Sequence, residues 1–288
     1  MRIENNVPLS KLTTFHVGGT IKNLYYPVDE AEIVDLIRDF NSKGTKYRII
    51  SGGSNVLAND KCEYEAIINM RDYDGSIKQI ADDVFSVGAG RRIQEVIREL
   101  NEVGFGGFEE LFSLPALVGG IVYMNAGIGN RTNPRFNFSD FVLRVKVLEK
   151  KTGNILWLTK DDCHFDYRES IFQNDEYIIL AAEIKPYHQD CEISKKRIDD
   201  RLEHCRKTQE WGNGCFGSLC SAYTKKIQLF VKKLPIHRKI YQSDKNPNWL
   251  VNKGNGTFSD AMRIIKYSSF FHKLCGKKFE VEVRIWDD

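Results

Sequence analysis

The sequence predicts an α+β fold on three observations. A helical pattern of apolar residues over 33–40 lies between two apolar segments of strand type. Residues 143–158 alternate apolar and charged side chains around Thr152-Gly153, which is typical of a β-hairpin. A helical stripe within 264–274 precedes a terminal segment, 279–286, with period-two alternation. Helices and strands interspersed in this way indicate a mixed fold.

The first elements lead into a glycine-rich loop. A strand is expected at 24–26, followed by the helix that carries the stripe over 33–40 and by a strand at 47–50. Asp29 and Glu32 have the spacing of a capping box at the start of this helix. The second strand runs directly into Ser51-Gly52-Gly53-Ser54-Asn55.

The later elements suggest a division into two domains. They are a strand at 84–87, a helix at 93–100, an apolar glycine-rich stretch at 111–129, the hairpin, a strand at 177–184 and a charged helix around 198–205. Beyond Gly214 the residue pattern of the chain changes, and a basic, helical stretch follows at 224–233. At roughly 150 residues per domain, the chain of 288 residues is expected to form two domains, 1–210 and 211–288.

Composition and charge exclude several classes of protein. With 42% hydrophobic and 11% aromatic residues, the chain is neither disordered nor fibrous. A formal net charge of +3, with no stretch that concentrates basic residues, argues against nucleic acid and anionic membrane as partners. No apolar run approaches the roughly 18 residues of a membrane span, and the N-terminus lacks the apolar core of a signal peptide. We therefore expect a cytoplasmic protein.

The seven cysteines predict neither a metal site nor a redox pair. They are odd in number, irregularly spaced and contain no Cys-x-x-Cys. His204, Cys205, Cys215 and Cys220 are close in sequence, but their spacing matches no common zinc pattern. We expect ordinary thiols and no metal.

Two glycine-rich loops are the candidate binding elements. In Ser51-Gly52-Gly53-Ser54-Asn55, consecutive small residues allow backbone N–H groups to point into one concavity, as in nests that bind phosphate oxygens, although many such stretches are plain turns. The stretch 115–127 is too apolar for a solvated loop. Either a flat or phosphorylated ligand approaches its backbone, or two strands pack closely there. No Walker motif and no three-glycine dinucleotide fingerprint is present.

The order of short motifs adds a family resemblance. The motifs are Thr13-Thr14-Phe15-His16-Val17-Gly18-Gly19, Gly52-Gly53-Ser54-Asn55, Pro115 through Gly127, Tyr167-Arg168-Glu169-Ser170, Gly217-Ser218, Asn255-Gly256-Thr257 and Glu282-Val283-Arg284. This series resembles the UDP-N-acetylenolpyruvoylglucosamine reductases, a family of flavoenzymes, over nearly the whole chain. The resemblance implies a two-part FAD-binding region of the flavin-oxidase type over 1–210, followed by a smaller α+β substrate domain over 211–288.

The resemblance also implies a cofactor site. FAD would be bound non-covalently, with its pyrophosphate on the first loop and its flavin lined by the second. The residues concerned are Gly52, Gly53, Ser54 and Asn55 in the first loop, and Gly119, Gly120, Asn125, Ala126 and Gly127 in the second. NADPH would pass a hydride to FAD, and the reduced flavin would pass it to the enolpyruvyl group of a nucleotide sugar. A monomer is expected.

Three residues would serve the second half-reaction. Hydride addition leaves negative charge at the α-carbon and its carboxylate, so that a cation and an acid are needed there. By the resemblance, Arg168 would hold the carboxylate, Ser218 would protonate the α-carbon, and Glu282 would act beside them from the terminal strand. All three would converge near the flavin N5. Each also has an ordinary alternative: a structural ion pair for Arg168, a turn for Ser218 and a solvated strand face for Glu282.

The chain departs from the family pattern at several places. Pro115-Ala116-Leu117 replaces Pro-Gly-Ser/Thr, Ile128-Gly129-Asn130 replaces Ala-Tyr-Gly, Leu219-Cys220 replaces the x-Phe after Gly-Ser, and Asn246-Pro247 stands in place of His-Ala. Three alternatives therefore remain. They are a diverged paralogue that reduces another enol or alkene, a flavin-binding protein without this turnover, and an oxidase of the wider FAD family.

Overall fold

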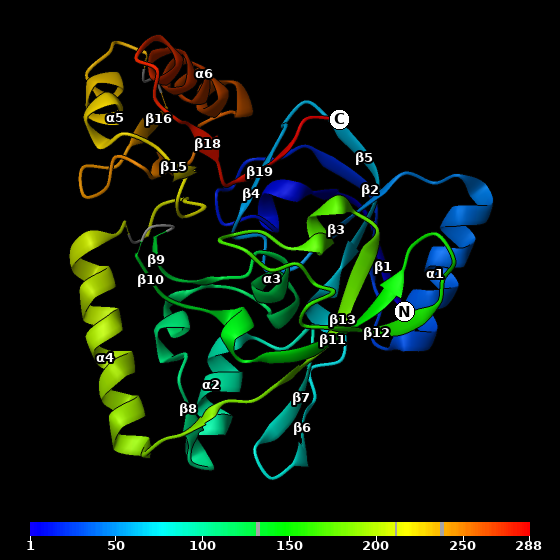
Figure 1. Cartoon of the computed structure of the whole chain (residues 1–288). Helices are drawn as coiled ribbons and strands as arrows, with labels where there is room; N and C mark the ends of the chain where they lie inside the picture. Colours follow the sequence, from blue (N-terminus) through cyan, green and yellow to red (C-terminus); the bar gives the residue numbers. More distant parts are fainter. Residues whose placement is uncertain (131–132, 211, 237–238) are drawn as a thin grey trace. The chain divides into compact units, whose positions relative to one another are not determined.

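The structure, a computed structural model, describes residues 1–130, 133–210, 212–236 and 239–288, and its elements are labelled in Figure 1. The chain forms two compact units. The first unit consists of Met1–Glu4, Asn23–Gly52 and Glu65–Glu203, and the second of Asn5–Lys22, Gly53–Tyr64 and His204–Asp288. Each unit has its own hydrophobic core. The assignment of FAD binding to 1–210 and of substrate binding to 211–288 stays a prediction.

The first unit is built on a five-stranded sheet. Its order is β12 (Ile155–Thr159), β11 (Val142–Glu149), β13 (Tyr177–Ile184), β7 (Val84–Gly88) and β6 (Ile77–Ala81), and all neighbours are antiparallel. The hairpin predicted around Thr152-Gly153 is confirmed as β11–β12. Seven of the eight residues of β13 are buried, which means that both faces of this central strand are covered.

Helices and smaller sheets complete this unit. The helices are α1 (Glu30–Lys43), α2 (Ile93–Glu102), α3 (Val118–Tyr123) and α4 (Cys191–Thr208), the last of which ends in the second unit. The two-stranded sheets are β8 (Phe105–Gly106) with β14 (Tyr187–His188), and β9 (Gly127–Asn130) with β10 (Asn133–Asn137). A further sheet has the order β1 (Arg2–Pro8), β2 (Thr20–Tyr26), β5 (Glu63–Asn69), β3 (Tyr47–Ile50), and β1, β2 and β5 contain residues of both units.

The predicted start of α1 is confirmed in part. The carboxylate of Asp29 accepts a hydrogen bond from the N–H of Glu32 at 2.9 Å, as a helix cap should. The carboxylate of Glu32, however, accepts from the N–H of Val28 instead of that of Asp29. The helix then buries the predicted apolar stripe, which consists of Ile33, Leu36, Ile37 and Phe40.

The second unit contains short strand pairs and two longer helices. The pairs are β4 (Val56–Ala58) with β19 (Arg284–Trp286), β15 (Cys220–Ala222) with β18 (Glu280–Val281), and β16 (Ile240–Gln242) with β17 (Leu250–Asn252). The helices are α5 (Lys225–Lys232) and α6 (Phe258–Leu274). No helix in the described part of the chain is long and apolar enough to cross a membrane.

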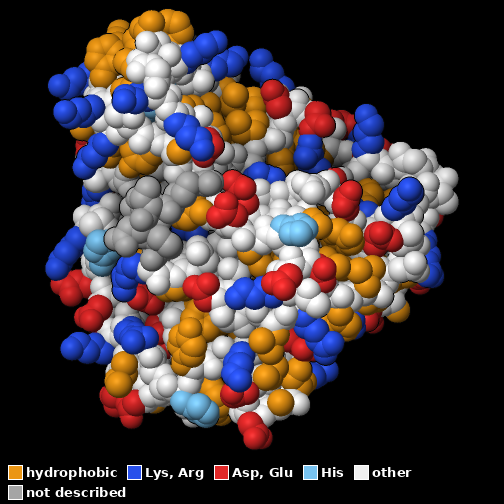
Figure 2. Space-filling model, viewed as in Figure 1, with side chains coloured by type: hydrophobic (Ala, Val, Ile, Leu, Met, Phe, Trp, Pro, Cys, Tyr) orange, Lys and Arg blue, Asp and Glu red, His pale blue; other side chains and the backbone are white. Residues whose placement is uncertain are grey.

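The stripe predicted on α6 has the wrong phase. Ile264 is buried, but Tyr267 is 42% and Leu274 70% exposed. The buried face instead includes Ser268 and His272, whose polar groups are hydrogen-bonded and which a hydrophobic pattern therefore does not count. Apolar side chains accordingly lie at the surface over α5 and α6 (Figure 2).

The single terminal strand predicted over 279–286 is wrong as well. It is two strands, β18 and β19, with Glu282 and Val283 between them. The chain changes partner at this point, because β18 pairs antiparallel with β15 whereas β19 pairs parallel with β4. Glu282 thus lies in the break and not on a strand face.

Candidate cofactor and substrate site

The two predicted glycine-rich loops meet in the first unit. A Cβ atom on Gly52 would lie 2.7 Å from the carbonyl oxygen of Pro115, and a Cβ atom on Gly120 would lie 3.0 Å from Oγ of Ser51. Neither position has room for a side chain without movement of its neighbours. Glycine at these positions therefore allows the loops to approach each other closely.

Several hydrogen-bond donors along these loops have no partner. Within the described residues, the N–H groups of Gly52, Gly53, Ser54 and Gly120 donate no hydrogen bond. The buried hydroxyl of Ser51 likewise has no partner there. Buried polar groups in proteins are nearly always hydrogen-bonded, so the Ser51 hydroxyl, beside the unpaired N–H groups of Gly52 and Gly120 in the first unit, indicates a missing acceptor. The oxygens of a pyrophosphate are acceptors of the required kind.

In the second unit, the backbone conformation and packing at position 53 require a glycine. Its φ is +65°, and a Cβ atom there would lie 1.9 Å from the carbonyl oxygen of Leu12. The N–H of Thr14 donates to the carbonyl oxygen of Gly53 at 3.0 Å, while the Thr14 hydroxyl donates to Cys215, 201 positions away, at 2.6 Å. The N-terminal motif Thr13–Gly19 thus joins the first loop to the C-terminal part of this unit.

The second loop contains a helix that the sequence did not predict. Gly119 belongs to α3, where its N–H donates to the carbonyl oxygen of Ala89 at 2.9 Å. Asn125 follows the helix with a left-handed φ of 40°, which is uncommon for a residue other than glycine. Ala126 is buried, and Gly127 packs so closely on Phe136 that a Cβ atom would lie 2.3 Å from its carbonyl oxygen. Close packing of two strands, β9 and β10, therefore explains Gly127.

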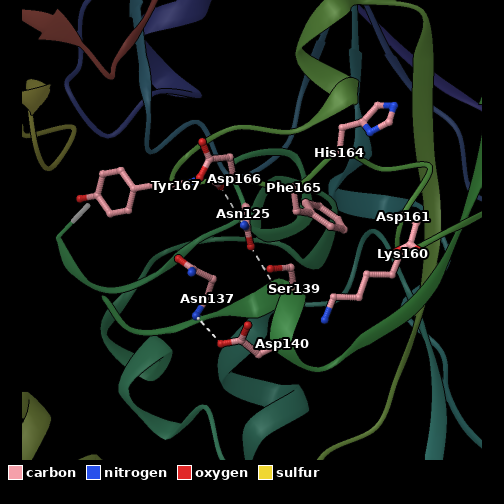
Figure 3. Close-up of a pocket in the computed structure, with 10 residues that line it drawn as sticks. All are labelled: Asn125, Asn137, Ser139, Asp140, Lys160, Asp161, His164, Phe165, Asp166 and Tyr167. Atoms are coloured by element: carbon pink, nitrogen blue, oxygen red, sulfur yellow. Dashed lines mark hydrogen bonds between the residues drawn. The ribbon is translucent and has the colours of Figure 1, made fainter. Parts of the chain in front are cut away.

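The side chain of Asn125 ties this loop to its neighbours. Its Oδ1 accepts from the N–H of Ser139 at 3.0 Å, and its Nδ2 donates to the carbonyl oxygen of Asp166 at 2.9 Å. Both contacts are visible in Figure 3. Asn125 is almost completely buried, and these two bonds hold its amide in one orientation.

Arg168 is held against the same loop. Its Nη1 donates to the carbonyl oxygen of Asn125 at 3.2 Å and its Nη2 to that of Gly127 at 2.6 Å. Arg168 also has a left-handed φ, 61°. Two strained residues that touch each other are a feature of functional sites. The structure therefore brings the predicted carboxylate-binding arginine to the loop predicted to line the flavin.

The residues after Arg168 support the same loop. The hydroxyl of Ser170 donates to the carbonyl oxygen of Tyr123 at 2.7 Å, and Nε2 of Gln173 donates to the same oxygen at 3.1 Å. Nε2 of Gln173 also lies 2.9 Å from the carbonyl oxygen of Arg168. The motif Tyr167-Arg168-Glu169-Ser170 thus acts, with Gln173, as a brace for residues 123–127.

A cavity of about 430 Å³ lies beside this brace, within the first unit. It is lined by Asn125, Asn137, Ser139, Asp140, Lys160, Asp161, His164, Phe165, Asp166 and Tyr167 (Figure 3). Its volume is in the range of small-molecule sites. Apart from Asn125 and Tyr167, which belong to quoted motifs, none of these side chains was singled out from the sequence, because the lining comes from separate segments with no shared motif.

Ser218 and Glu282 lie in the second unit. The N–H of Glu282 donates to the carbonyl oxygen of Leu219, the residue after Ser218, at 2.8 Å. The strands that follow Ser218 and precede Glu282 are paired, with Cys220 opposite Val281. The two predicted catalytic residues, which come from motifs distant in sequence, therefore lie on backbone segments that pair with each other.

Asn55 belongs to the same neighbourhood. Its Nδ2 donates to the carbonyl oxygen of Glu282 at 3.2 Å, and the N–H of Arg284 donates to the carbonyl oxygen of Asn55 at 3.1 Å. The last residue of the first loop is thus fixed against the segment that carries Glu282.

Cys220 is a neighbour of Glu282 that the sequence did not single out as functional. Burial raises the pKa of the Cys220 thiol well above its ordinary value, and the negative charge of Glu282 raises it further. Burial also raises the pKa of Cys215 to about 11. Both thiols are therefore neutral near pH 7, and neither is activated as a nucleophile.

The predicted site thus falls into two described parts. Gly52, Gly119, Gly120, Asn125, Ala126, Gly127 and Arg168 belong to the first unit, and Gly53, Ser54, Asn55, Ser218 and Glu282 to the second. Within each part the structure brings residues of separate motifs together. The convergence of Arg168 with Ser218 and Glu282 stays a prediction.

The chain is similar in sequence to known proteins. Residues 21–159 match the family described as FAD binding domain. A UDP-N-acetylenolpyruvoylglucosamine reductase of Bacillus pumilus is 26% identical over 291 residues, which cover 98% of this chain and 92% of that protein. One of Thermotoga petrophila is 27% identical and covers 96% of each chain.

A solved structure shares the fold. The UDP-N-acetylenolpyruvylglucosamine reductase of Thermus caldophilus aligns over 100% of both chains with a TM-score of 0.78 and 22% identity. This similarity confirms the predicted α+β fold. The relatives, which match nearly the whole chain, and the matched FAD binding domain confirm the predicted resemblance: over nearly its whole length the chain is similar to the UDP-N-acetylenolpyruvoylglucosamine reductases.

Proposed function

We propose that this chain is an FAD-dependent, NADPH-driven reductase that converts UDP-N-acetylglucosamine enolpyruvate to UDP-N-acetylmuramate, a precursor of peptidoglycan. The observation that carries the proposal is the pairing of the segments that contain Ser218 and Glu282, because it joins the backbones of two separate family motifs. The full-length relatives carry the name of this reaction. The same proposal includes a cytoplasmic monomer whose substrate is held by residues 211–288.

The described loops fit FAD. Within the first unit, the unpaired N–H groups of Gly52 and Gly120, with the orphaned hydroxyl of Ser51, would hold pyrophosphate oxygens. Residues 125–127, which Arg168 fixes in place, would line the flavin. When bound, FAD supplies the hydride chemistry that no side chain can perform.

Arg168 would serve the substrate carboxylate. Its guanidinium is charged at all relevant pH values and can bind a carboxylate in a planar, two-pronged manner. The bonds from Arg168 to the carbonyl oxygens of Asn125 and Gly127 fix the plane of the group before a ligand arrives. A preorganised cation loses little entropy when it binds the developing charge.

Ser218 would deliver the proton to the α-carbon. A serine hydroxyl is a weak acid, so its position must be fixed and its conjugate base stabilised by the site. The chain around Ser218 is held on two sides, because the N–H of Leu219 donates to the carbonyl oxygen of Asn248 at 2.7 Å while its carbonyl oxygen accepts from Glu282. Glu282 would act in the same half-reaction.

The test is to separate the two half-reactions in a Ser218→Ala variant. We expect NADPH to reduce the bound flavin at nearly the wild-type rate, while reoxidation by the enolpyruvyl substrate slows by about 10²–10⁴, the usual cost of a lost proton donor. Ser221→Ala, three residues away on the same segment, is the matched control and should leave both rates unchanged. Equal slowing of both half-reactions by Ser218→Ala would contradict the assigned role.

A further inference from the structure

Helices α5 and α6 carry an exposed apolar surface. Leu229 and Phe230 lie on the outer face of α5, and Tyr267, Phe270 and Leu274 lie on that of α6. We call these five residues the α5–α6 surface. All are more than 40% exposed, and Leu274 is 70% exposed. On α6, the spacing of three and four residues places Tyr267, Phe270 and Leu274 on one side of the helix, whereas Leu229 and Phe230 are consecutive on α5.

The exposed apolar residues of the two helices join into one patch. The ring of Phe230 packs edge-on against that of Phe271, with centroids 4.9 Å apart, and Phe271 in turn packs against Phe270 at 5.2 Å. Figure 2 shows hydrophobic side chains at this end of the second unit, surrounded by lysines and arginines. Single exposed apolar residues are normal, whereas contiguous patches with a polar rim are typical of interaction sites.

The rim of the patch is strongly basic. Residues 225–278 contain thirteen lysine or arginine residues and two acidic residues, a formal net charge of +11, which the rest of the chain offsets to leave +3. The expectation that no stretch concentrates basic residues is therefore wrong. Lys226 and Lys233 on one side, and Lys266, Lys273 and Lys277 on the other, are exposed and form no ion pair within the described residues.

We propose that the α5–α6 surface docks the protein peripherally on an anionic lipid bilayer. The apolar side chains would enter the boundary between headgroups and acyl chains, and the lysines would contact the anionic headgroups. An apolar face flanked by lysines is the pattern of helices that lie in this interface. The proposal concerns a surface contact and is independent of the function proposed above.

The charges and side chains disfavour other occupants. A second copy of the chain would bring two basic rims together, so that like charges would repel across the contact. Nucleic acid would match the lysines, but the aliphatic side chains of Leu229 and Leu274 contribute nothing to phosphate contacts or base stacking. An anionic bilayer can bind both the apolar side chains and the lysines of this surface.

The test is flotation of the full-length, FAD-loaded protein with vesicles. We expect binding to vesicles of phosphatidylcholine with about 30% phosphatidylglycerol, and none to pure phosphatidylcholine, because the headgroup charge is required. Binding should weaken as the ionic strength rises through the physiological range. Absence of binding to the anionic vesicles at low salt would overturn the proposal.

Paired variants separate the two components. Phe270→Ser with Leu274→Ser should abolish flotation, and Lys226→Glu with Lys273→Glu should weaken it by at least about fivefold per lysine. The matched controls, Val103→Ser and Lys78→Glu, alter exposed residues of the first unit and should have no effect. The proposal would also be overturned if the wild-type protein bound RNA and these variants lost that binding. The same holds if the wild-type protein were a dimer that Phe270→Ser converted to a monomer.

Discussion

The side-chain amide of Asn55 donates to the carbonyl oxygen of Glu282, 3.2 Å away, although the two residues are 227 positions apart in the chain. The return contact, from the N–H of Arg284 to the carbonyl oxygen of Asn55, fixes the same pair of segments a second time. A residue assigned to the cofactor loop is thus attached to a residue assigned to the substrate half-reaction. Cofactor binding and the position of Glu282 should therefore be coupled.

Ser51→Ala should weaken FAD binding without loss of apoprotein stability. Because the Ser51 hydroxyl is buried without a partner, its removal costs the apoprotein no hydrogen bond. Loss of a hydrogen bond to the cofactor should weaken binding by about 1 kcal/mol, or roughly fivefold. Fluorescence titration of apoprotein with FAD measures the affinity, and thermal unfolding measures the stability. Ser42→Ala, at an exposed position of α1, is the control, and unchanged FAD affinity in Ser51→Ala would contradict the proposed pyrophosphate site.

Arg168→Lys should disturb the flavin although it keeps the charge. An ammonium group cannot reproduce the planar arrangement that bonds to the carbonyl oxygens of Asn125 and Gly127 together. We expect a shifted flavin absorption spectrum and a slower reoxidation by substrate, by about 10²-fold. Arg135→Lys, an exposed ion-paired arginine of the same unit, should change neither. An unchanged spectrum with unchanged rates would show that Arg168 does not order the loop.

Glu282→Gln should lower the pKa of Cys220. Burial raises that pKa first, and the carboxylate of Glu282 raises it further. Removal of the negative charge should therefore shift the pH profile of Cys220 alkylation, followed by peptide mass spectrometry, toward lower pH. Glu280→Gln is the matched control, since that carboxylate pairs with Lys278 instead. A profile that does not move in Glu282→Gln would mean that the carboxylate faces elsewhere.

The cap of α6 should make stability depend on pH. Burial opposes ionisation of Asp260, but hydrogen bonds from Thr257 and Arg263 outweigh it and lower its pKa. A lowered carboxyl pKa stabilises the fold above the ordinary value, near 4, and this contribution is lost as the pH falls through the folded pKa. Thr257→Ala should cost about 1 kcal/mol at pH 7 and less at pH 3. Urea unfolding at both pH values, with Thr208→Ala as the control, measures this; an equal cost at both would contradict the linkage.

The sequence predicted most of the elements whose pattern is local. The stripe of α1, the hairpin β11–β12 and the buried strand β13 follow from periodicity and turn residues, which do not depend on distant parts of the chain. The break at Glu282 could not be predicted in this way. It arises because the chain exchanges β15 for β4 as its partner, and pairing partners leave no mark in the local pattern.

Much the same holds for the site. The glycine loops and Arg168 could be named from their motifs, but the closeness of Gly52 to Pro115 could not. The helix α3 is short, contains two glycines and lacks a side-chain cap, so propensity alone argues against it. The unpaired hydroxyl of Ser51 is a property of packing, which becomes visible only when the donors and acceptors are assigned in three dimensions.

The most direct test of the proposed function is anaerobic stopped-flow reoxidation of the wild-type enzyme. The bound FAD is first reduced with NADPH and then mixed with UDP-N-acetylglucosamine enolpyruvate. We predict rapid return of the oxidised flavin spectrum, with one equivalent of UDP-N-acetylmuramate formed per flavin. A flavin that NADPH reduces but that this substrate fails to reoxidise would contradict the proposed reaction and favour a diverged paralogue with another enol or alkene substrate.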